Sequence, residues 1–308
     1  MKTSRIRLGT GVLIPSNRIA PVAANAFASL NKLAPGRIDF GVGTGFTGRR
    51  AMGLGAIKLA EMDEYIRVVM ALLRAETVET EIEGALRKIR FLNPELGLTN
   101  THDPVGLYVS AYGPRAMGMV AKWRADWLTF VGSVEGGAAD IAKMQAAWSK
   151  AGHEAGDMKA VAFALGCVLA DGEAFDSPRA MAQAGPRGAV LLHRAADEAL
   201  AGLPNTSPVP DAVATEVAGY VALAREFEPA DARYLENHRG HLMFLREAEK
   251  PFVTGELIRR TSFTGTEAAI GDKIAALRDA GYTQFTIQLV PGHEVAIEDW
   301  ARIKRAFG

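Results

Sequence analysis

"GRIDFGVGTGFTG", residues 36–48, joins an apolar segment to a run of glycines. Its last six residues, GTGFTG, satisfy G-x-G-x-x-G, the pattern of a dinucleotide-binding turn. Such a turn opens a helix at its third glycine, and an acidic residue follows about 20 positions later at the tip of a second strand. Here we expect the helix to begin late, after "AMGLGA" (51–56), and Glu61, Asp63 and Glu64 fall on the helical pattern. The sequence therefore argues against a Rossmann nucleotide site.

The same stretch is better interpreted as a strand whose carboxyl end is bare backbone. Glycine has no Cβ, so a large ligand can lie against it. Two other predicted strand ends share this design, "LGTGV" (8–12) and "SAYGPRA" (110–116). In the second, Gly113-Pro114 begins a predicted helix whose free N–H groups suit an anion, with Arg115 nearby. Three such ends favour a flat ring with a phosphate tail; glycines that only serve tight turns are the alternative.

Strand and helix patterns alternate along the chain, which is typical of an α/β fold. The predicted strands are nearly continuous apolar runs, as in a parallel sheet that is covered on both faces or closed into a barrel. Their ranges are 5–14 (expected to be buried), 37–43, 106–113, 126–132, 158–170 and 283–290. Residues 77–95 alternate polar and apolar side chains and predict a hairpin.

The composition limits the kinds of binding partner and the cellular location that we expect for this protein. The 308 residues are 48% hydrophobic, and 35 Lys and Arg balance 35 Asp and Glu. Zero net charge argues against nucleic acid or an anionic membrane as the main partner. A single cysteine, Cys167, excludes an internal disulfide, and no apolar run approaches the ~20 residues that span a bilayer. We expect a cytoplasmic protein without a signal peptide.

Three segments resemble the luciferase-like family of flavin-dependent oxidoreductases. They are "RIRLGTGVLIPSNRIAPVAANAFASLNKLAPGRIDFGVGTG" (5–45), "LYVSAYGPRAMGMVAKWRADWLTF" (107–130) and "GDKIAALRDAGYTQFTIQLV" (271–290). The resemblance implies an α/β, (β/α)₈ TIM-barrel-like domain over 1–308, with a helical insertion around 171–260. About six strands are recognisable, and the resemblance aligns the chain's start with the family's third strand. We therefore expect an N-terminally shortened barrel that lacks the family's second-strand histidine; the alternative is that the true start of the protein lies upstream of this sequence.

The resemblance also implies the cofactor, the partners and the cofactor-binding residues. The cofactor is FMN or the deazaflavin coenzyme F-420, the substrate is a small molecule, and the protein is a homodimer that can depend on a separate flavin reductase. A non-prolyl cis peptide is implied at Gly11–Val12, against the flavin ring. The remaining cofactor-binding residues implied at the strand ends and the phosphate turn are Thr44, Gly45, Ala111, Tyr112, Gly113, Pro114, Arg115 and Ala116.

Few side chains are candidates for catalysis. "NHRGHLMF" places His238 and His241 three apart, on one face if the segment is helical, where they can donate protons or orient substrate. The alternative is two histidines at a surface or between helices. We expect His193 to be solvated and His102 and Asp103 to be structural. No Cys/His cluster has metal-ligand spacing, so no metal site is expected.

These features support three functional hypotheses. The first is a luciferase-like monooxygenase that uses reduced FMN and oxygen, so that the cofactor carries the redox chemistry. The second is an F-420-dependent hydride-transfer reductase on the same scaffold. The third is a shortened, non-catalytic flavin-binding protein, which the missing second-strand histidine suggests.

Overall fold

The computed structural model describes residues 3–201 and 209–307. Its internal contacts divide the chain into two compact units, which are described separately. Unit 1 comprises Met1–Arg49, Gly55–Leu128 and Met144–Met158, and unit 2 comprises Arg50–Leu54, Thr129–Lys143 and Lys159–Gly308. The single domain expected over 1–308 stays a prediction.

Unit 1 is built on parallel strands in the order β1 (Leu8–Gly9), β2 (Ile38–Val42), β5 (Gly106–Ser110) and β6 (Asp126–Phe130), the last of which continues into unit 2. Leu8 lies opposite Ile38, and Asp39 lies opposite Gly106. Because neighbouring strands are parallel, their carboxyl ends meet at one edge of the sheet.

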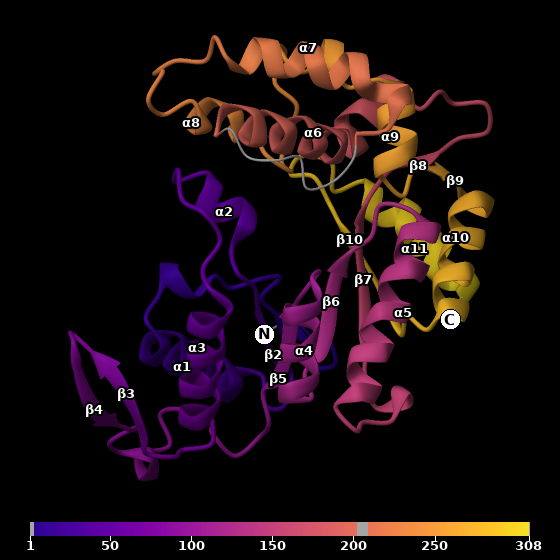
Figure 1. The fold of residues 1–308 in the computed structure, drawn as a ribbon. Helices are drawn as coiled ribbons and strands as arrows, with labels where there is room; N and C mark the ends of the chain where they lie inside the picture. The colour runs from indigo at the N-terminus through magenta and orange to yellow at the C-terminus, as the bar shows by residue number, and fades with distance from the viewer. Residues whose placement is uncertain (1–2, 202–208, 308) are drawn as a thin grey trace. The chain divides into compact units, whose positions relative to one another are not determined.

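Helices and a hairpin complete unit 1. The helices α1 (Ala20–Leu33) and α3 (Leu59–Leu73) pack side by side, and α4 (Pro114–Trp123) follows β5 (Figure 1). A short helix, α2 (Phe46–Arg50), precedes α3, and β3 (Val78–Ile82) pairs with β4 (Ala85–Ile89) as the predicted hairpin. The core joins these layers: the Phe40 ring of β2 lies 5.1 Å from that of Phe27 on α1 and 6.4 Å from that of Tyr65 on α3.

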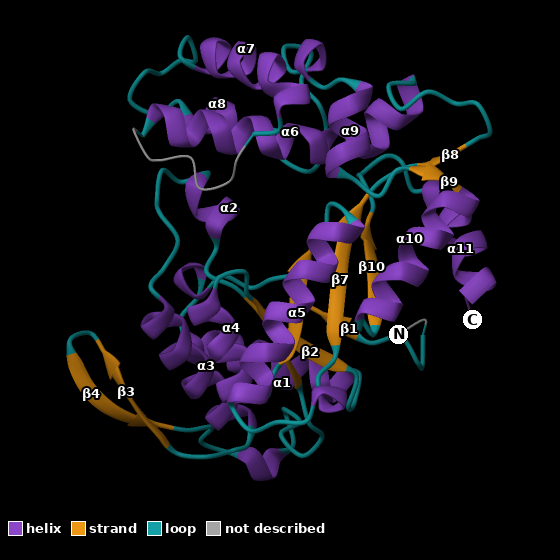
Figure 2. Ribbon diagram, turned by 45° about the vertical axis from the view of Figure 1, so that its right-hand side comes forward, coloured by secondary structure: helices purple, strands orange, loops and turns teal. Residues whose placement is uncertain are grey.

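Unit 2 contains the end of β6 and the parallel pair β7 (Ala160–Leu165) and β10 (Gln284–Gln288), which run side by side in Figure 2. A second parallel pair is β8 (Val168–Leu169) with β9 (Gly265–Thr266). Helix α5 (Val134–Lys150) begins in this unit and ends in unit 1. The other helices are α6 (Pro178–Leu200), α7 (Ala214–Ala224), α8 (Tyr234–Asn237), α9 (Gly255–Thr261), α10 (Glu267–Ala280) and α11 (Ala296–Phe307).

The expected α/β class with six recognisable parallel strands is confirmed. Two details differ from the sequence predictions. The segment 5–14 is not a buried strand, because β1 pairs over two residues with β2 alone among the described residues, and Leu8 is 45% exposed. The segment 158–170 holds two strands, because the chain leaves β7 at Gly166, where a Cβ would stand 2.1 Å from the carbonyl oxygen of Phe263.

Within the described ranges, no helix is both long enough and apolar enough to cross a membrane.

A buried amide fixes the turn that leads into β2. Asn31, on α1, is fully buried, and its Nδ2 donates to the carbonyl oxygens of Asn100 (3.2 Å) and Asp103 (2.8 Å). Its Oδ1 accepts from the N–H of Gly36 at 3.0 Å. The side chain of Asn31 therefore ties the turn before β2 to the loop before β5, and Asp103 is structural, as expected.

We predict that Asn31→Ala lowers the free energy of unfolding by about 2–4 kcal/mol, because buried backbone groups lose their partners. Urea denaturation followed by tryptophan fluorescence measures the change. Asn93→Ala is the matched control, since Asn93 is exposed and caps no N–H with its side chain. Equal midpoints for the two variants would contradict this role of Asn31.

A charged loop precedes α6 in unit 2. The carboxylate of Glu173 accepts hydrogen bonds from Arg179, from Ser177 Oγ (2.7 Å) and from the N–H of Ala170 (2.8 Å). The hydrogen bond from Arg179 is the main cause that lowers the pKa of Glu173 from 4.5 to about 2. A carboxyl group whose pKa is lowered by folding stabilises the folded state above its unfolded pKa.

We predict that Glu173→Gln reduces the melting temperature at pH 7 and that the difference from the parent protein vanishes as the pH falls from 4.5 towards 2. Thermal melts across this range measure it, with the exposed Glu226→Gln as control. A deficit that persists unchanged at pH 2 would refute the electrostatic cause.

Candidate functional site

The tips of β1, β2 and β5 come together in unit 1. A Cβ on Gly43, just beyond β2, would stand 2.9 Å from Cγ2 of Val12 and 3.4 Å from Cβ of Ser110. Leu13 bridges Val42, and the N–H of Gly43 donates to the carbonyl oxygen of Leu13 at 3.2 Å. Three segments that are distant in sequence therefore share one edge, as the glycine pattern predicted.

The first tip contains the implied cis peptide, which the structure has at Gly11–Val12. Thr10 anchors this segment, because its Oγ1 donates to the carbonyl oxygen of Gly41 at 2.7 Å and accepts from the N–H of Gly41 at 3.1 Å. A Cβ on Gly41 would stand 1.9 Å from the carbonyl oxygen of Thr10. Only glycine permits this approach.

The second tip turns at Thr44 and Gly45. Gly45 has φ +76° and is buried against Ile14, whose Cγ2 would lie 2.4 Å from a Cβ there. The N–H of Ile57 donates to the carbonyl oxygen of Thr44 at 3.1 Å. Helix α2 begins directly at Phe46, so the expectation that a helix starts only after residue 56 was wrong for this short helix and right for α3.

The third tip leads from β5 into α4. Ala111 is buried, and its carbonyl oxygen accepts from Nε1 of the buried Trp127 at 2.8 Å. Gly113 is the N-cap of α4 and Pro114 its first residue, and no side chain caps the helix. The N–H groups of Arg115 and Ala116 therefore have no partner inside the helix.

The exposed surface of these tips suits a planar, phosphorylated ligand. A Cβ on Gly11 or Gly113 would meet no atom within 4 Å, so both glycines present backbone to open space. Two aromatic rings beside the tips are exposed, Phe46 to 47% and Tyr112 to 57%. Bare N–H groups at a helix start bind phosphate, and exposed aromatic faces pack against flat rings.

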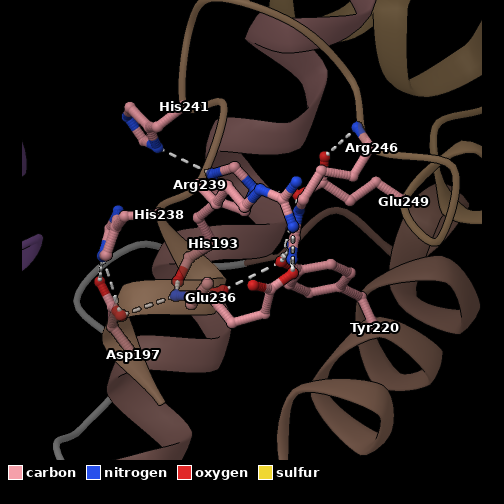
Figure 3. Close-up of polar contacts among 10 residues, drawn as sticks. His193, Asp197, Tyr220, Glu236, His238, Arg239, His241, Arg246 and Glu249 are labelled. Carbon is pink, nitrogen blue, oxygen red and sulfur yellow. Dashed lines mark hydrogen bonds and ion pairs between the residues drawn. The ribbon is translucent and has the colours of Figure 1, made fainter. Parts of the chain in front are cut away.

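The candidate histidines His238 and His241 lie in unit 2, in a turn that follows α8 rather than in a helix. Gly240 and Leu242 have positive φ there, and this turn directs both rings to His193 of α6 (Figure 3). The ring centres of His238 and His241 are 5.2 Å apart. A shared face was expected only if the segment is helical, and this condition is not met; the turn brings the two rings together instead.

His193 was expected to be solvated, and this was wrong. It is 1% exposed, and it lies on the buried stripe of α6 with Ala189 and Ala196. Its Nε2 contacts Oε1 of Glu249 at 2.7 Å, and its Nδ1 contacts Nδ1 of His241 at 2.7 Å. The helical spacing of this stripe was the available sequence signal for burial.

Two carboxylates contact two of the three imidazoles, those of His193 and His238. Oε1 of the fully buried Glu249 also accepts from Nη2 of Arg246 at 2.6 Å, and Oδ2 of Asp197 accepts from Arg50 and lies 3.0 Å from Nε2 of His238. Burial opposes the charge of Glu249, but hydrogen bonds from His193 and Arg246 prevail and hold its pKa at about 2. Both carboxylates are thus acceptors at neutral pH.

Burial is the main cause that lowers the pKa of His193. Burial also lowers the pKa of His241, to about 3, and electrostatic repulsion from His193 and His238 adds to this effect. Neutral imidazoles have one N–H and one lone pair each. Because Glu249 only accepts, Nε2 of His193 carries its proton and Nδ1 its lone pair. Oδ2 of Asp197 likewise accepts a hydrogen bond from Nε2 of His238.

Unit 2 also contains a pocket of about 240 Å³ at the N-terminus of α5. Arg187, Arg194 and Arg260 line it together with Ser133, Gly136 and Asp140. Nε of Arg194 is buried and has no hydrogen-bond partner among the described residues. The helix start and the guanidinium groups favour an anion in this pocket.

All the predicted cofactor-binding residues fall in unit 1, and both predicted histidines fall in unit 2. Sequence reasoning missed the groups that organise the histidines, Asp197, Tyr220, Arg246 and Glu249, because they come from separate helices and loops without a shared motif.

A sequence model described as luciferase-like monooxygenase matches residues 1–284. The chain belongs to this family. The resemblance deduced from the strand tips is therefore confirmed.

An F420-dependent glucose-6-phosphate dehydrogenase of Beutenbergia cavernae is 39% identical over 127 residues, which are 39% of this chain and 36% of the relative. The chain thus spans about a third of that relative's length in the match. The coenzyme F420 dependent tetrahydromethanopterin reductase of Methanopyrus kandleri matches with a TM-score of 0.60 at 20% identity, covering 96% of this chain and 82% of that structure.

A Baeyer-Villiger monooxygenase from the CAM plasmid of Pseudomonas putida, in complex with FMN, matches with a TM-score of 0.58 at 12% identity. The match covers 97% of this chain and 77% of that structure. At these identities the two solved structures support the shared fold alone.

Proposed function

We propose that this luciferase-like chain is an oxidoreductase that transfers hydride to or from the deazaflavin coenzyme F-420. The observation that carries the proposal is the edge of bare backbone at the tips of β1, β2 and β5. The named F420-dependent relative supports F-420 over FMN as its ligand. When bound, F-420 would supply a hydride donor or acceptor, and the protein would hold and orient it.

The residues of unit 1 fit such a coenzyme. The N–H groups of Arg115 and Ala116 would hold its phosphate, beside the open Cα of Gly113. The backbone at Gly11–Val12, Thr44 and Gly45 would lie along the ring and its ribityl chain. The side chain of Tyr112, which is 57% exposed, would cover a ring edge.

We predict that Gly113→Leu weakens F-420 binding about tenfold or more, because a side chain would occupy the space of the phosphate. A side chain fits the fold at this position, since a Cβ there meets nothing within 4 Å and φ is −89°, and a thermal melt of the variant measures the cost of leucine at the N-cap. Fluorescence titration of F-420 into the full chain measures the affinity.

Gly118→Leu is the matched control, because Gly118 lies on the same helix with equally open surroundings. It should bind F-420 as the parent protein does. An unchanged affinity in Gly113→Leu would remove the phosphate site from this turn.

We further infer that the substrate is a small phosphorylated molecule, and the relatives' name suggests glucose-6-phosphate as the first one to test. The pocket at the start of α5 supports an anion, since Arg187 and Arg194 line it. A phosphate there would provide acceptors for the buried Nε of Arg194.

Arg194→Gln should raise the KM for glucose-6-phosphate by about 10–100-fold with little change in kcat, because the lost contact is present in the ground state and the transition state alike. Reduction of F-420 followed by its absorbance measures both constants. Arg225→Gln, at an exposed position, should leave KM unchanged. An unchanged KM in Arg194→Gln would show that the pocket does not bind the substrate.

An FMN-dependent monooxygenase is the second candidate, which the family's description and the FMN-bound structural neighbour favour. The absorption spectrum and mass of the coenzyme that co-purifies with the chain distinguish it from the F-420 enzyme. Coenzyme binding without turnover would instead support the non-catalytic binding protein. The homodimer, the separate flavin reductase and the cytoplasmic location stay predictions.

A further inference from the structure

We propose that His193, His238 and His241 form a binding site for a divalent transition-metal ion of the Zn²⁺ class. One ring nitrogen from each residue lies within 4.8 Å of the others. This proposal rests on unit 2 alone and does not depend on the identity of the coenzyme. It departs from the expectation of no metal site, which considered only spacing along the sequence and therefore could not include His193.

The hydrogen bonds to the two carboxylates engage one nitrogen of each ring and leave Nδ1 of His193 and of His238 as the nitrogens that can bind a metal. Nε2 of His193 donates to Glu249, and Nε2 of His238 donates to Asp197. Nδ1 of His238 is buried and has no hydrogen-bond partner within the described part of the chain. Buried nitrogen atoms without partners are costly, so they need an explanation.

Glu249 and Asp197 contact His193 and His238 in the way that carboxylates contact metal-bound histidines. A ligating imidazole generally donates its other N–H to a carboxylate, which fixes the ring and strengthens the donor nitrogen. His193 with Glu249 and His238 with Asp197 both have this arrangement, at 2.7 Å and 3.0 Å. Arg246 and Arg50 hold the two carboxylates from other directions.

The distances are compatible with coordination after small side-chain movements. Zinc–nitrogen bonds of about 2.0–2.1 Å in a tetrahedral site place the nitrogens about 3.4 Å apart. The present contact of 2.7 Å between Nδ1 of His193 and Nδ1 of His241 is a shared proton in the metal-free chain. A metal ion would replace this proton, which moves to Nε2 of His241 by exchange with water.

Three neutral imidazoles are the ligand set of open zinc sites, in which a water molecule or a substrate oxygen takes the fourth position. Imidazole also binds Co²⁺, Ni²⁺ and Cu²⁺, so Co²⁺ can serve as a coloured probe. The ion would join α6 to the turn at 238–241, and it would stabilise unit 2 by binding only the folded chain.

The test uses the full chain without a histidine tag, stripped of metal with a chelator. Titration with Co²⁺ should give visible absorption bands that saturate at one ion per chain, and Zn²⁺ should displace them. In the presence of Zn²⁺ at about a hundred times its Kd, the melting temperature should rise by about 5 °C or more. No saturable binding to the parent chain overturns the proposal and leaves the cluster as a hydrogen-bonded network.

Variants assign the site to these histidines. His241→Ala removes the least buried ligand and should weaken Co²⁺ binding about thirtyfold or more, and Zn²⁺ should no longer raise its melting temperature. His238→Asn, a second variant, should behave alike if His241→Ala is unstable. The control His102→Ala removes an exposed histidine and should bind as the parent does. Parent-like affinity in both cluster variants overturns the proposal.

Discussion

The close approach of two backbones at Thr10 and Gly41 is the constraint on which the candidate coenzyme site depends. A Cβ on Gly41 would overlap the carbonyl oxygen of Thr10, because the two atoms would be 1.9 Å apart. The hydroxyl of Thr10 also forms hydrogen bonds with the carbonyl oxygen and the N–H of Gly41. This contact holds the segment after β1 against β2, although β1 itself pairs with β2 over two residues. Val12 then reaches Gly43, and Gly43 reaches Ser110 at the tip of β5. A side chain at Gly41 would separate these tips before any ligand was present.

In unit 2 the organising constraint is electrostatic. Glu249 is fully buried, and a buried carboxylate is tolerated only when donors surround it. Arg246 supplies a side-chain and a backbone N–H, and His193 supplies its Nε2. Because Glu249 needs that proton, the lone pair of His193 must face the opposite way, towards His241. The position of the proton on His193 is therefore determined by the hydrogen bonds that the buried carboxylate of Glu249 requires.

Strand positions and the glycine tips could be predicted from sequence, because apolar runs and chain-breaking residues are local signals. The strands at 38–42, 106–110 and 126–130 lie inside their predicted ranges. Residues 5–14 were misjudged because apolar content does not reveal that β1 has one partner strand among the described residues. His238 and His241 were noticed from their spacing, whereas His193 and Glu249 were missed. Burial and hydrogen bonding depend on how α6, α8 and the loop at 246–249 pack, which no local pattern encodes.

The glycines of unit 1 fall into two physical kinds, and the difference separates architecture from ligand binding. Gly41 and Gly45 are explained by the protein itself, since a Cβ would overlap Thr10 or Ile14. Gly113 is explained by neither packing nor backbone conformation, because its surroundings are open and φ is −89°. Ser, Thr, Asp and Asn at an N-cap accept a hydrogen bond from the first turn, whereas glycine, although common at this position, has no side-chain oxygen to do so. An uncapped helix start is reasonable where an external anion takes the place of the capping oxygen, which is the role that a coenzyme phosphate would have at α4.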